Sequence, residues 1–325
     1  MVLGKVKSVL EKMEEGKASA PQLKKGEHFV RHTSSICPEC YRILPATIFE
    51  RDSKIWIRKE CPEHGEVEAL YWGDAEMYHR AMDYWVPPRN VTGSNVKAAA
   101  PCPLNCGFCP LHKNQTALAN ITVTNRCNLS CWYCFFYAEK LGYVYEPSVE
   151  GIRNMIRTLQ KQGPFTPNAV QITGGEPTLR EDLAQVIKVI KEEGVTHIQL
   201  NTNGIKFTQL LLNEGLDAAV EYGKKLRNAG VNTLYLSFDG VTPQSNPKNH
   251  YEIPYDLDIF RLSGLHSIVL VPTVIKDTHA HEVGDMIKFA SRNLDIIRSV
   301  NFQPISTTGS IPGKERGKHR ITIPE

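Results

Sequence analysis

The sequence lacks the features that mark several classes of protein. No stretch of its 325 residues approaches the roughly 20 consecutive apolar residues of a membrane-spanning helix. The N-terminal segment carries charges every few residues and has no continuous apolar stretch, unlike a secretory signal. Lys and Arg number 38 against 35 Asp and Glu, and a net charge of +3 offers no basic track for a nucleic acid. We therefore expect a cytoplasmic globular protein without a nucleic-acid partner.

Cysteine is absent from the long part of the chain that follows Cys134, although the sequence holds nine cysteines. An odd number without a secretory signal argues against a disulfide framework, because thiols seldom pair in a reducing compartment. The cysteines fall into three groups of three. Thiols crowded into short clusters at one end of a long chain usually bind metal. The sequence therefore predicts three metal sites.

The first group forms two knuckles, Cys37-Pro-Glu-Cys40 and Cys61-Pro-Glu-His64, separated by a predicted hairpin within residues 34–72. Three cysteines and one histidine at this spacing suit a tetrahedral mononuclear site for zinc or iron. A structural zinc site and an electron-transferring, rubredoxin-like iron both remain open.

The second part of the chain alternates strand-like and helix-like patterns from residue 119 to about residue 305. This alternation is typical of a parallel α/β sheet, here an incomplete barrel or an open sheet. Residues 239–266 fit the pattern least, because prolines interrupt their first half. The predicted strands are 120–124, 169–173, 197–200, 233–238, 267–271 and 299–302, and the predicted helices are 148–162, 180–193, 215–229 and 280–294.

The third cysteine group, Cys127, Cys131 and Cys134, directly follows the first strand of this repeat. Parallel α/β proteins place active sites at this end of their strands. Three thiolates on one short loop can hold three corners of a 4Fe-4S cluster, which leaves the fourth iron open to a ligand such as S-adenosylmethionine (SAM). A closed zinc site with a distant fourth ligand is the alternative.

The second group, Cys102, Cys106 and Cys109, has the same spacing, but no predicted strand precedes it. We expect it to hold an auxiliary 4Fe-4S cluster, with His112, solvent, substrate or a ligand from outside this chain as the fourth partner. Structural zinc with His112 is the alternative.

Two motifs together resemble the radical SAM superfamily: Cys127-x-x-x-Cys131-x-x-Cys134 with Tyr133 before its last cysteine, and Gly174-Gly175-Glu176 after the second strand. The resemblance implies a partial (β/α)6 barrel and reductive cleavage of SAM to methionine and a 5′-deoxyadenosyl radical. It also implies that the SAM site includes Tyr133, Gly174, Gly175, Glu176, Asn201, Asn203, Ser237 and Thr273.

A narrower resemblance covers most of the chain, from CPEC and CPEHG through CPLNCGFCPLHK and NITVTNRCNLSC to GGEPTLREDL and LNTNGI. These segments are similar to archaeal tetraether lipid synthases, a group related to proteins described as dihydro-hydroxymethylpterin methyltransferases. The resemblance implies coupling of the terminal carbons of diether lipid chains, a peripheral membrane contact and a reduced electron donor such as ferredoxin. The alternatives are a radical methyltransferase acting on 7,8-dihydro-6-hydroxymethylpterin and a noncatalytic protein that carries electrons or binds RNA.

These patterns divide the chain into a helical extension at 1–33, a metal-binding hairpin at 34–90, an auxiliary cluster loop at 91–118 and a radical SAM core at 119–310. Residues 311–325 would begin a C-terminal region. Because Ile321–Glu325 resemble the opening of a helix, we expect that region to be incomplete.

Overall fold

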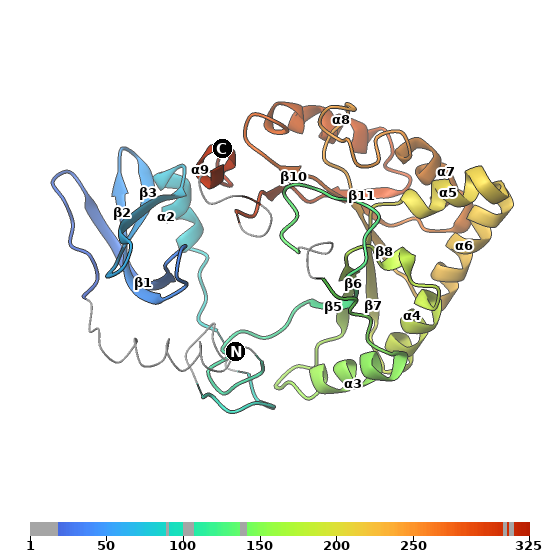
Figure 1. Cartoon of the computed structure of the whole chain (residues 1–325), viewed down its shortest axis with the longest axis horizontal. Coiled ribbons are helices and arrows are strands. Elements are labelled where there is room, and N and C mark those ends of the chain that lie inside the picture. Colours follow the sequence, from blue (N-terminus) through green and yellow to red (C-terminus); the bar gives the residue numbers. More distant parts are fainter. Residues whose placement is uncertain (1–18, 89–90, 100–106, 137–141, 308–310, 312–314) are drawn as a thin grey trace. The chain divides into compact units, whose positions relative to one another are not determined.

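The computed structural model describes residues 19–88, 91–99, 107–136, 142–307, 311 and 315–325 (Figure 1). The predicted N-terminal helix, Cys102 and Cys106 lie outside these residues. The chain divides into two compact units. Unit 1 comprises residues 1–87, 100–104 and 321–325, and unit 2 comprises residues 88–99 and 105–320.

Unit 1 is built on a four-stranded antiparallel sheet in the order β1 (His28–Ile36), β2 (Ile43–Arg51), β3 (Lys54–Cys61), β4 (Gly65–Trp72). The predicted hairpin is present as β2 and β3. Asp52 and Ser53 turn between them with φ of 53° and 54°, the left-handed backbone that two-residue hairpin turns require. Helix α2 (Ala75–Met82) follows, with Asp74 as its N-cap. Strand β1 begins inside the segment predicted as a helical extension, so that prediction is wrong for residues 28–33.

Unit 2 contains six parallel strands in the order β5, β6, β7, β8, β9, β11, so each strand lies beside its predecessor in this sheet. This sequential order is that of a partial barrel and confirms the predicted fold class. Figure 1 shows helices α3 to α8 along one side of the sheet. The strands are β5 (Ala119–Thr124), β6 (Ala169–Gly174), β7 (His197–Thr202), β8 (Thr233–Ser237), β9 (Ile268–Val271) and β11 (Ile297–Val300).

The helices of unit 2 depart from the predicted pattern at two places. Residues 205–214 form helix α5, which was not predicted, and the proline-rich segment contains helix α7. Pro254 lies in the first turn of α7, where its missing N–H costs no hydrogen bond. The helices are α3 (Val149–Leu159), α4 (Leu183–Glu192), α5 (Ile205–Glu214), α6 (Leu216–Ala229), α7 (Ile253–Ser263), α8 (Val283–Ser291) and α9 (Arg316–His319), with 3-10 turns η2 (Pro177–Leu179) and η3 (Ala280–Glu282).

Two smaller differences concern the C-terminal part of the chain. Strand β11 begins and ends two residues before the predicted strand 299–302. Two short strands, β10 (Thr273–Val274) after β9 and β12 (Gln303–Pro304) after β11, pair with each other in parallel. Residues 322–325 form a hydrogen-bonded turn, in which the Glu325 amide donates to the Thr322 carbonyl at 3.0 Å, and not the predicted helix start.

The two faces of the parallel sheet differ in polarity. Val170, Ile172, Leu200, Leu234 and Leu270 are fully buried and belong to one apolar core with the helices. The residues that alternate with them are largely polar, because side chains of a strand point to opposite faces in turn. The polar face is where the candidate site lies. Among the described residues, no helix has the length and apolarity needed to cross a membrane.

Candidate functional site

The cysteine loop is held at its start by the glycine turn that follows β6. The amides of Gly175 and Glu176 donate to the carbonyls of Thr124 and Arg126 at 2.9 and 2.8 Å. A Cβ at Gly174 would lie 2.1 Å from the Thr124 oxygen, and one at Gly175 would lie 2.1 Å from the Arg126 oxygen. Only glycine therefore allows the two backbones to approach this closely.

Two residues that sequence analysis missed, Asn125 and Arg180, also anchor this loop. Asn125 is 3% exposed, and its side chain donates to the Tyr143 carbonyl at 2.6 Å and accepts from the Tyr145 amide at 2.8 Å. The buried Arg180 guanidinium donates to the carbonyls of Val123 and Pro147 at 2.9 and 2.8 Å. These contacts fix the end of β5 and the start of the loop.

All of the residues predicted to hold the third cluster and SAM line one cavity of about 460 Å³. The cavity walls come from strands β5 to β10, from β12 and from the cysteine loop. Those predicted residues are Cys127, Cys131, Tyr133, Cys134, Gly174, Gly175, Glu176, Asn201, Asn203, Ser237 and Thr273.

The Glu176 carboxylate accepts hydrogen bonds from other residues of the protein. It accepts from the Thr178 amide and hydroxyl at 3.1 and 2.6 Å, from the Thr202 hydroxyl at 2.7 Å and from the Asn203 amide at 2.8 Å. Burial raises the pKa of Glu176, and these hydrogen bonds oppose the rise. Glu176 thus joins the glycine turn to the end of β7.

A second buried carboxylate, Asp239, lies at the end of β8 and is fully buried. It accepts from the Tyr133 hydroxyl, from the Lys248 ammonium at 2.7 Å and from the Thr273 amide at 2.9 Å. Burial raises the pKa of Tyr133 above its usual range, so the phenol keeps its proton. Sequence analysis missed Asp239 and Lys248. The signal that it could have used is the position of Asp239 two residues after Ser237 at a strand end.

The polar face of the sheet supplies carboxamides to the same cavity. Asn120, Gln171 and Gln199 are aligned across β5, β6 and β7, and Asn201 is aligned with Tyr235 of β8. Asn120, Gln171, Asn201, Tyr235 and Gln303 all line the cavity. Strands covered by apolar layers on both faces would carry Val, Ile or Leu here, so these amides indicate a site for a polar ligand.

The donor set in the cavity fits an iron–sulfur cluster with one open iron. Cys127, Cys131 and Cys134 are free thiols, and no fourth cysteine of the described residues lines the cavity. Burial raises the pKa of Cys127 to about 11, so a metal would be needed to hold it as a thiolate. When bound, such a cluster supplies an electron to SAM.

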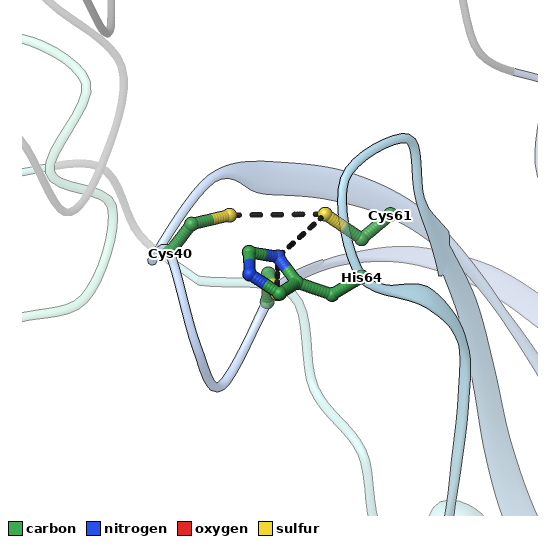
Figure 2. Close-up of side chains that lie close together, drawn as sticks. Cys40, Cys61 and His64 are labelled. Carbon is green, nitrogen blue, oxygen red and sulfur yellow. Dashed lines mark hydrogen bonds between the residues drawn. The ribbon is translucent and has the colours of Figure 1, made fainter.

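The first cysteine group is assembled in unit 1 as a four-ligand site of Cys37, Cys40, Cys61 and His64. Figure 2 labels the last three of these residues. The Sγ atoms of Cys40 and Cys61 are 3.7 Å apart, and His64 Nδ1 lies 3.6 Å from Cys37 Sγ and 3.5 Å from Cys61 Sγ. A tetrahedral site with metal–sulfur bonds of about 2.3 Å would place its sulfurs about 3.8 Å apart. The ligand atoms therefore already have the spacing of a tetrahedral metal site.

Protonation supports the same interpretation of this site. Burial disfavours the Cys61 thiolate, but hydrogen bonds from His64 and the Glu63 amide outweigh it and lower the pKa of Cys61 to about 6. Burial raises the pKa of Cys40. A bound cation would therefore find one thiolate already formed at neutral pH.

The second cysteine group is described only at Cys109, which is buried. The His112 amide donates to the Cys109 carbonyl at 3.0 Å, and the rings of Phe108 and His112 are 5.9 Å apart. With Cys102 and Cys106 outside the described residues, the auxiliary cluster stays a prediction.

Comparison with known proteins gives two family matches. Residues 121–290 match the radical SAM superfamily, and residues 29–73 match the HMPTM N-terminal zinc ribbon domain. A 7,8-dihydro-6-hydroxymethylpterin dimethyltransferase of Methanocaldococcus jannaschii is 45% identical to this chain, and the match covers 91% of this chain and 57% of the relative. A probable GTP 3′,8-cyclase of Methanothermobacter marburgensis is 26% identical over 65% of each chain. A crystal structure of methylornithine synthase gives a TM-score of 0.44 at 16% identity over 63% of this chain and 58% of the other. The chain thus spans less than two thirds of these relatives.

Proposed function

Because this chain belongs to the radical SAM superfamily, we propose that it uses SAM-derived radical chemistry to form a carbon–carbon bond at an unactivated carbon of its substrate. The first substrate that we propose is a reduced pterin, which would receive a methyl or methylene group from a separate one-carbon carrier after the 5′-deoxyadenosyl radical has removed a hydrogen atom. The proposed partners are this substrate and a one-electron donor such as a reduced ferredoxin.

The polar face of the cavity carries the proposal of a pterin. A pterin is a flat heterocycle whose edge presents several hydrogen-bond donors and acceptors. Asn and Gln carboxamides offer both kinds of group, and Asn120, Gln171 and Gln303 line the cavity. Gln171 is only 9% exposed, and it lines this cavity. The name of the relative in Methanocaldococcus jannaschii supports the same substrate class.

A long-chain lipid is the second candidate substrate, and a different observation favours it. Large apolar side chains are exposed on and beside the cysteine loop: Trp132 by 46%, Phe135 by 66%, Tyr143 by 63% and Val144 by 66%. Exposed apolar groups gathered beside a cavity are typical of a surface that meets an apolar ligand or a membrane. The reaction in this case is the coupling of two alkyl chain ends.

The roles that we propose for the protein's own residues do not depend on this choice. Cys127, Cys131 and Cys134 hold the cluster, and Gly174 and Gly175 let the backbone come close to SAM. Asn201, Asn203, Ser237 and Thr273 offer polar groups around it. We further propose that Cys102, Cys106 and Cys109 hold an auxiliary 4Fe-4S cluster that acts on the substrate after SAM cleavage.

The first test separates SAM cleavage from product formation. Anaerobically reconstituted Cys131→Ala should release no 5′-deoxyadenosine under reductant, because two thiolates cannot hold the cluster in place. Cys109→Ala, a matched loss of one thiol from the second group, should keep SAM cleavage and make no final product. Liquid chromatography of 5′-deoxyadenosine measures the first outcome. Cleavage retained by Cys131→Ala and lost by Cys109→Ala would mean that the two clusters are reversed.

The second test identifies the substrate. The protein is incubated with SAM and reductant, in one reaction with 7,8-dihydro-6-hydroxymethylpterin and a methylene-carrying tetrahydrofolate as one-carbon donor, and in another with vesicles of archaeal diether lipid. We expect a methylated pterin in mass spectra of the first reaction. A coupled lipid in the second reaction, with the pterin unchanged, would replace the pterin proposal by the lipid proposal.

A further inference from the structure

Tyr133 links the cysteine loop to a fully buried carboxylate. The residue lies between Cys131 and Cys134, and its hydroxyl donates to Asp239 Oδ2. The two residues are 106 positions apart in sequence. A hydrogen bond to a buried charge is stronger than one between neutral groups, so it can hold a loop in one geometry.

The other partners of Asp239 fix its carboxylate in turn. Lys248 places its ammonium 2.7 Å from Oδ2 and 5.3 Å from the centre of the Tyr133 ring. The Thr273 amide donates to Oδ1 at 2.9 Å. Lys248 therefore neutralises the buried charge and also contacts the face of the tyrosine ring.

Neighbouring residues immobilise this group. Asn249, next to Lys248, is fully buried and donates to the carbonyls of Asn203 and Ser237 at 2.7 and 2.9 Å. His279, 2% exposed, hydrogen-bonds the Thr273 carbonyl through Nδ1. The pair of Asp239 and Lys248 is thus connected through Asn249 to the ends of β7 and β8, and through the Thr273 amide to the start of β10.

The other contacts that hold the cysteine loop lie near Cys127. The glycine turn holds the backbone before Cys127, and Asn203 donates to the Asn128 side chain at 2.8 Å. Both contacts are on the Cys127 side of the loop. On the Cys131–Cys134 side, the Tyr133 hydroxyl makes the hydrogen bond to the strand ends, and the Tyr133 ring packs against Ile275 and Ile305.

We propose that Asp239 is a positioning residue that fixes the Cys131–Cys134 half of the cysteine loop through the Tyr133 hydroxyl, with Lys248 as its counter-ion. The role concerns cluster geometry and SAM cleavage, which every substrate proposed above would share. It does not depend on the pterin or on the lipid.

Tyr133→Phe tests the proposal by removing one oxygen and leaving all three thiols. The variant should still bind iron and sulfide after anaerobic reconstitution. With SAM added, the electron paramagnetic resonance spectrum of its reduced cluster should differ from that of wild type with SAM. The KM for SAM should rise about 5- to 10-fold, the effect of one lost hydrogen bond, with a smaller change in kcat.

Asp239→Asn and the double variant make the test specific. Tyr133→Phe removes this hydrogen bond and Asp239→Asn removes the charge that strengthens it, so the double variant should be no worse in KM than the poorer single variant. Tyr222→Phe is the matched control, because the Tyr222 hydroxyl on α6 is buried and has no hydrogen-bond partner among the described residues. Spectra and KM of Tyr133→Phe that equal those of Tyr222→Phe would overturn the proposal, and so would additive effects of the two site variants. If Asp239→Asn fails to fold, the comparison of the two tyrosine variants still decides.

Discussion

At the scale of single residues, the most enclosed ion pair of unit 1 is that of Glu27 with Arg58. Both side chains are 1% exposed, and Arg58 Nη1 donates to Glu27 Oε2 at 2.8 Å. Glu68 accepts from Arg58 at 2.6 Å and also contacts Arg51, and the Arg58 guanidinium lies 4.4 Å from the centre of the Phe49 ring. Hydrogen bonds from Arg58 chiefly lower the pKa of Glu27 to about 2, and burial opposes them.

This shift predicts the acid sensitivity of unit 1. The folded pKa of about 2 lies below the ordinary value of 4.5, so the ionised carboxylate stabilises the fold above pH 4.5 and this contribution is lost as the pH falls toward 2. The full contribution is on the order of 3 kcal/mol. Glu27→Gln should therefore destabilise unit 1 by about 3 kcal/mol at pH 7, and the difference from wild type should shrink below pH 4.5.

Urea unfolding followed by pulsed hydrogen exchange in β2 and β3 peptides would measure this difference. Glu60→Gln is the matched control, because Glu60 is exposed on β3. It should unfold like wild type at every pH. A Glu27→Gln variant with a pH-independent stability difference would contradict the assignment of the shift to this carboxylate.

At the scale of elements, the glycine turn at the end of β6 packs closely against the backbone that leads from β5 into the cysteine loop. Gly174 has φ of 153°, and a side chain at Gly175 would meet the backbone oxygen of Arg126. A backbone atom cannot rotate away as a side chain can, so the clash must displace the cysteine loop or the turn. The geometry of the cavity therefore depends on the absence of these two side chains.

Gly175→Ala should weaken SAM binding and cleavage by about 10²-fold, the effect of a displacement near 1 Å at a reacting site. The fold should persist, because the apolar core lies on the other face of the sheet. Equilibrium dialysis with SAM and a thermal melt measure the two quantities. Gly284→Ala in α8 is the control, since a Cβ there meets nothing within 4 Å. Normal SAM affinity in Gly175→Ala would show that the turn can move without cost.

At the scale of the whole molecule, the two units have different sources of stability. Unit 2 has a large apolar core between sheet and helices, whereas unit 1 has two small clusters, one of which consists of Cys37, Leu44 and Cys61 beside Cys40. Small domains with little core commonly depend on a bound metal. We expect unit 1 to depend on its metal far more than unit 2 does.

Cys61→Ala, which removes one ligand of the first site, tests this dependence. Hydrogen exchange in β1 to β4 should accelerate at least tenfold, because binding energy at a structural metal site is folding energy. Release of 5′-deoxyadenosine should stay within about twofold of wild type, since the cluster loop belongs to unit 2. Loss of SAM cleavage in step with unit 1 would show that the two units are coupled in folding.

Several features of the candidate site were predictable from sequence because they are local. The spacing of Cys127, Cys131 and Cys134, the glycine pair after β6 and the alternation of strands and helices all lie within short segments. The hairpin turn at Asp52 and Ser53 is local in the same way. Helix α7 was not predictable from the pattern, because prolines obscured it and its first turn tolerates Pro254.

The sequence by itself determined the class of fold and the three groups of thiols, and it predicted residues that line one cavity. Only the tertiary structure decided which partners they meet. Asp239 meets Tyr133, and Glu176 meets Asn203, because parallel strands bring their carboxyl ends to one edge of the sheet. The polar face of the sheet likewise follows from the strand register, which places Asn120 beside Gln171. Such contacts depend on strand order across long sequence separations, which local spacing does not encode.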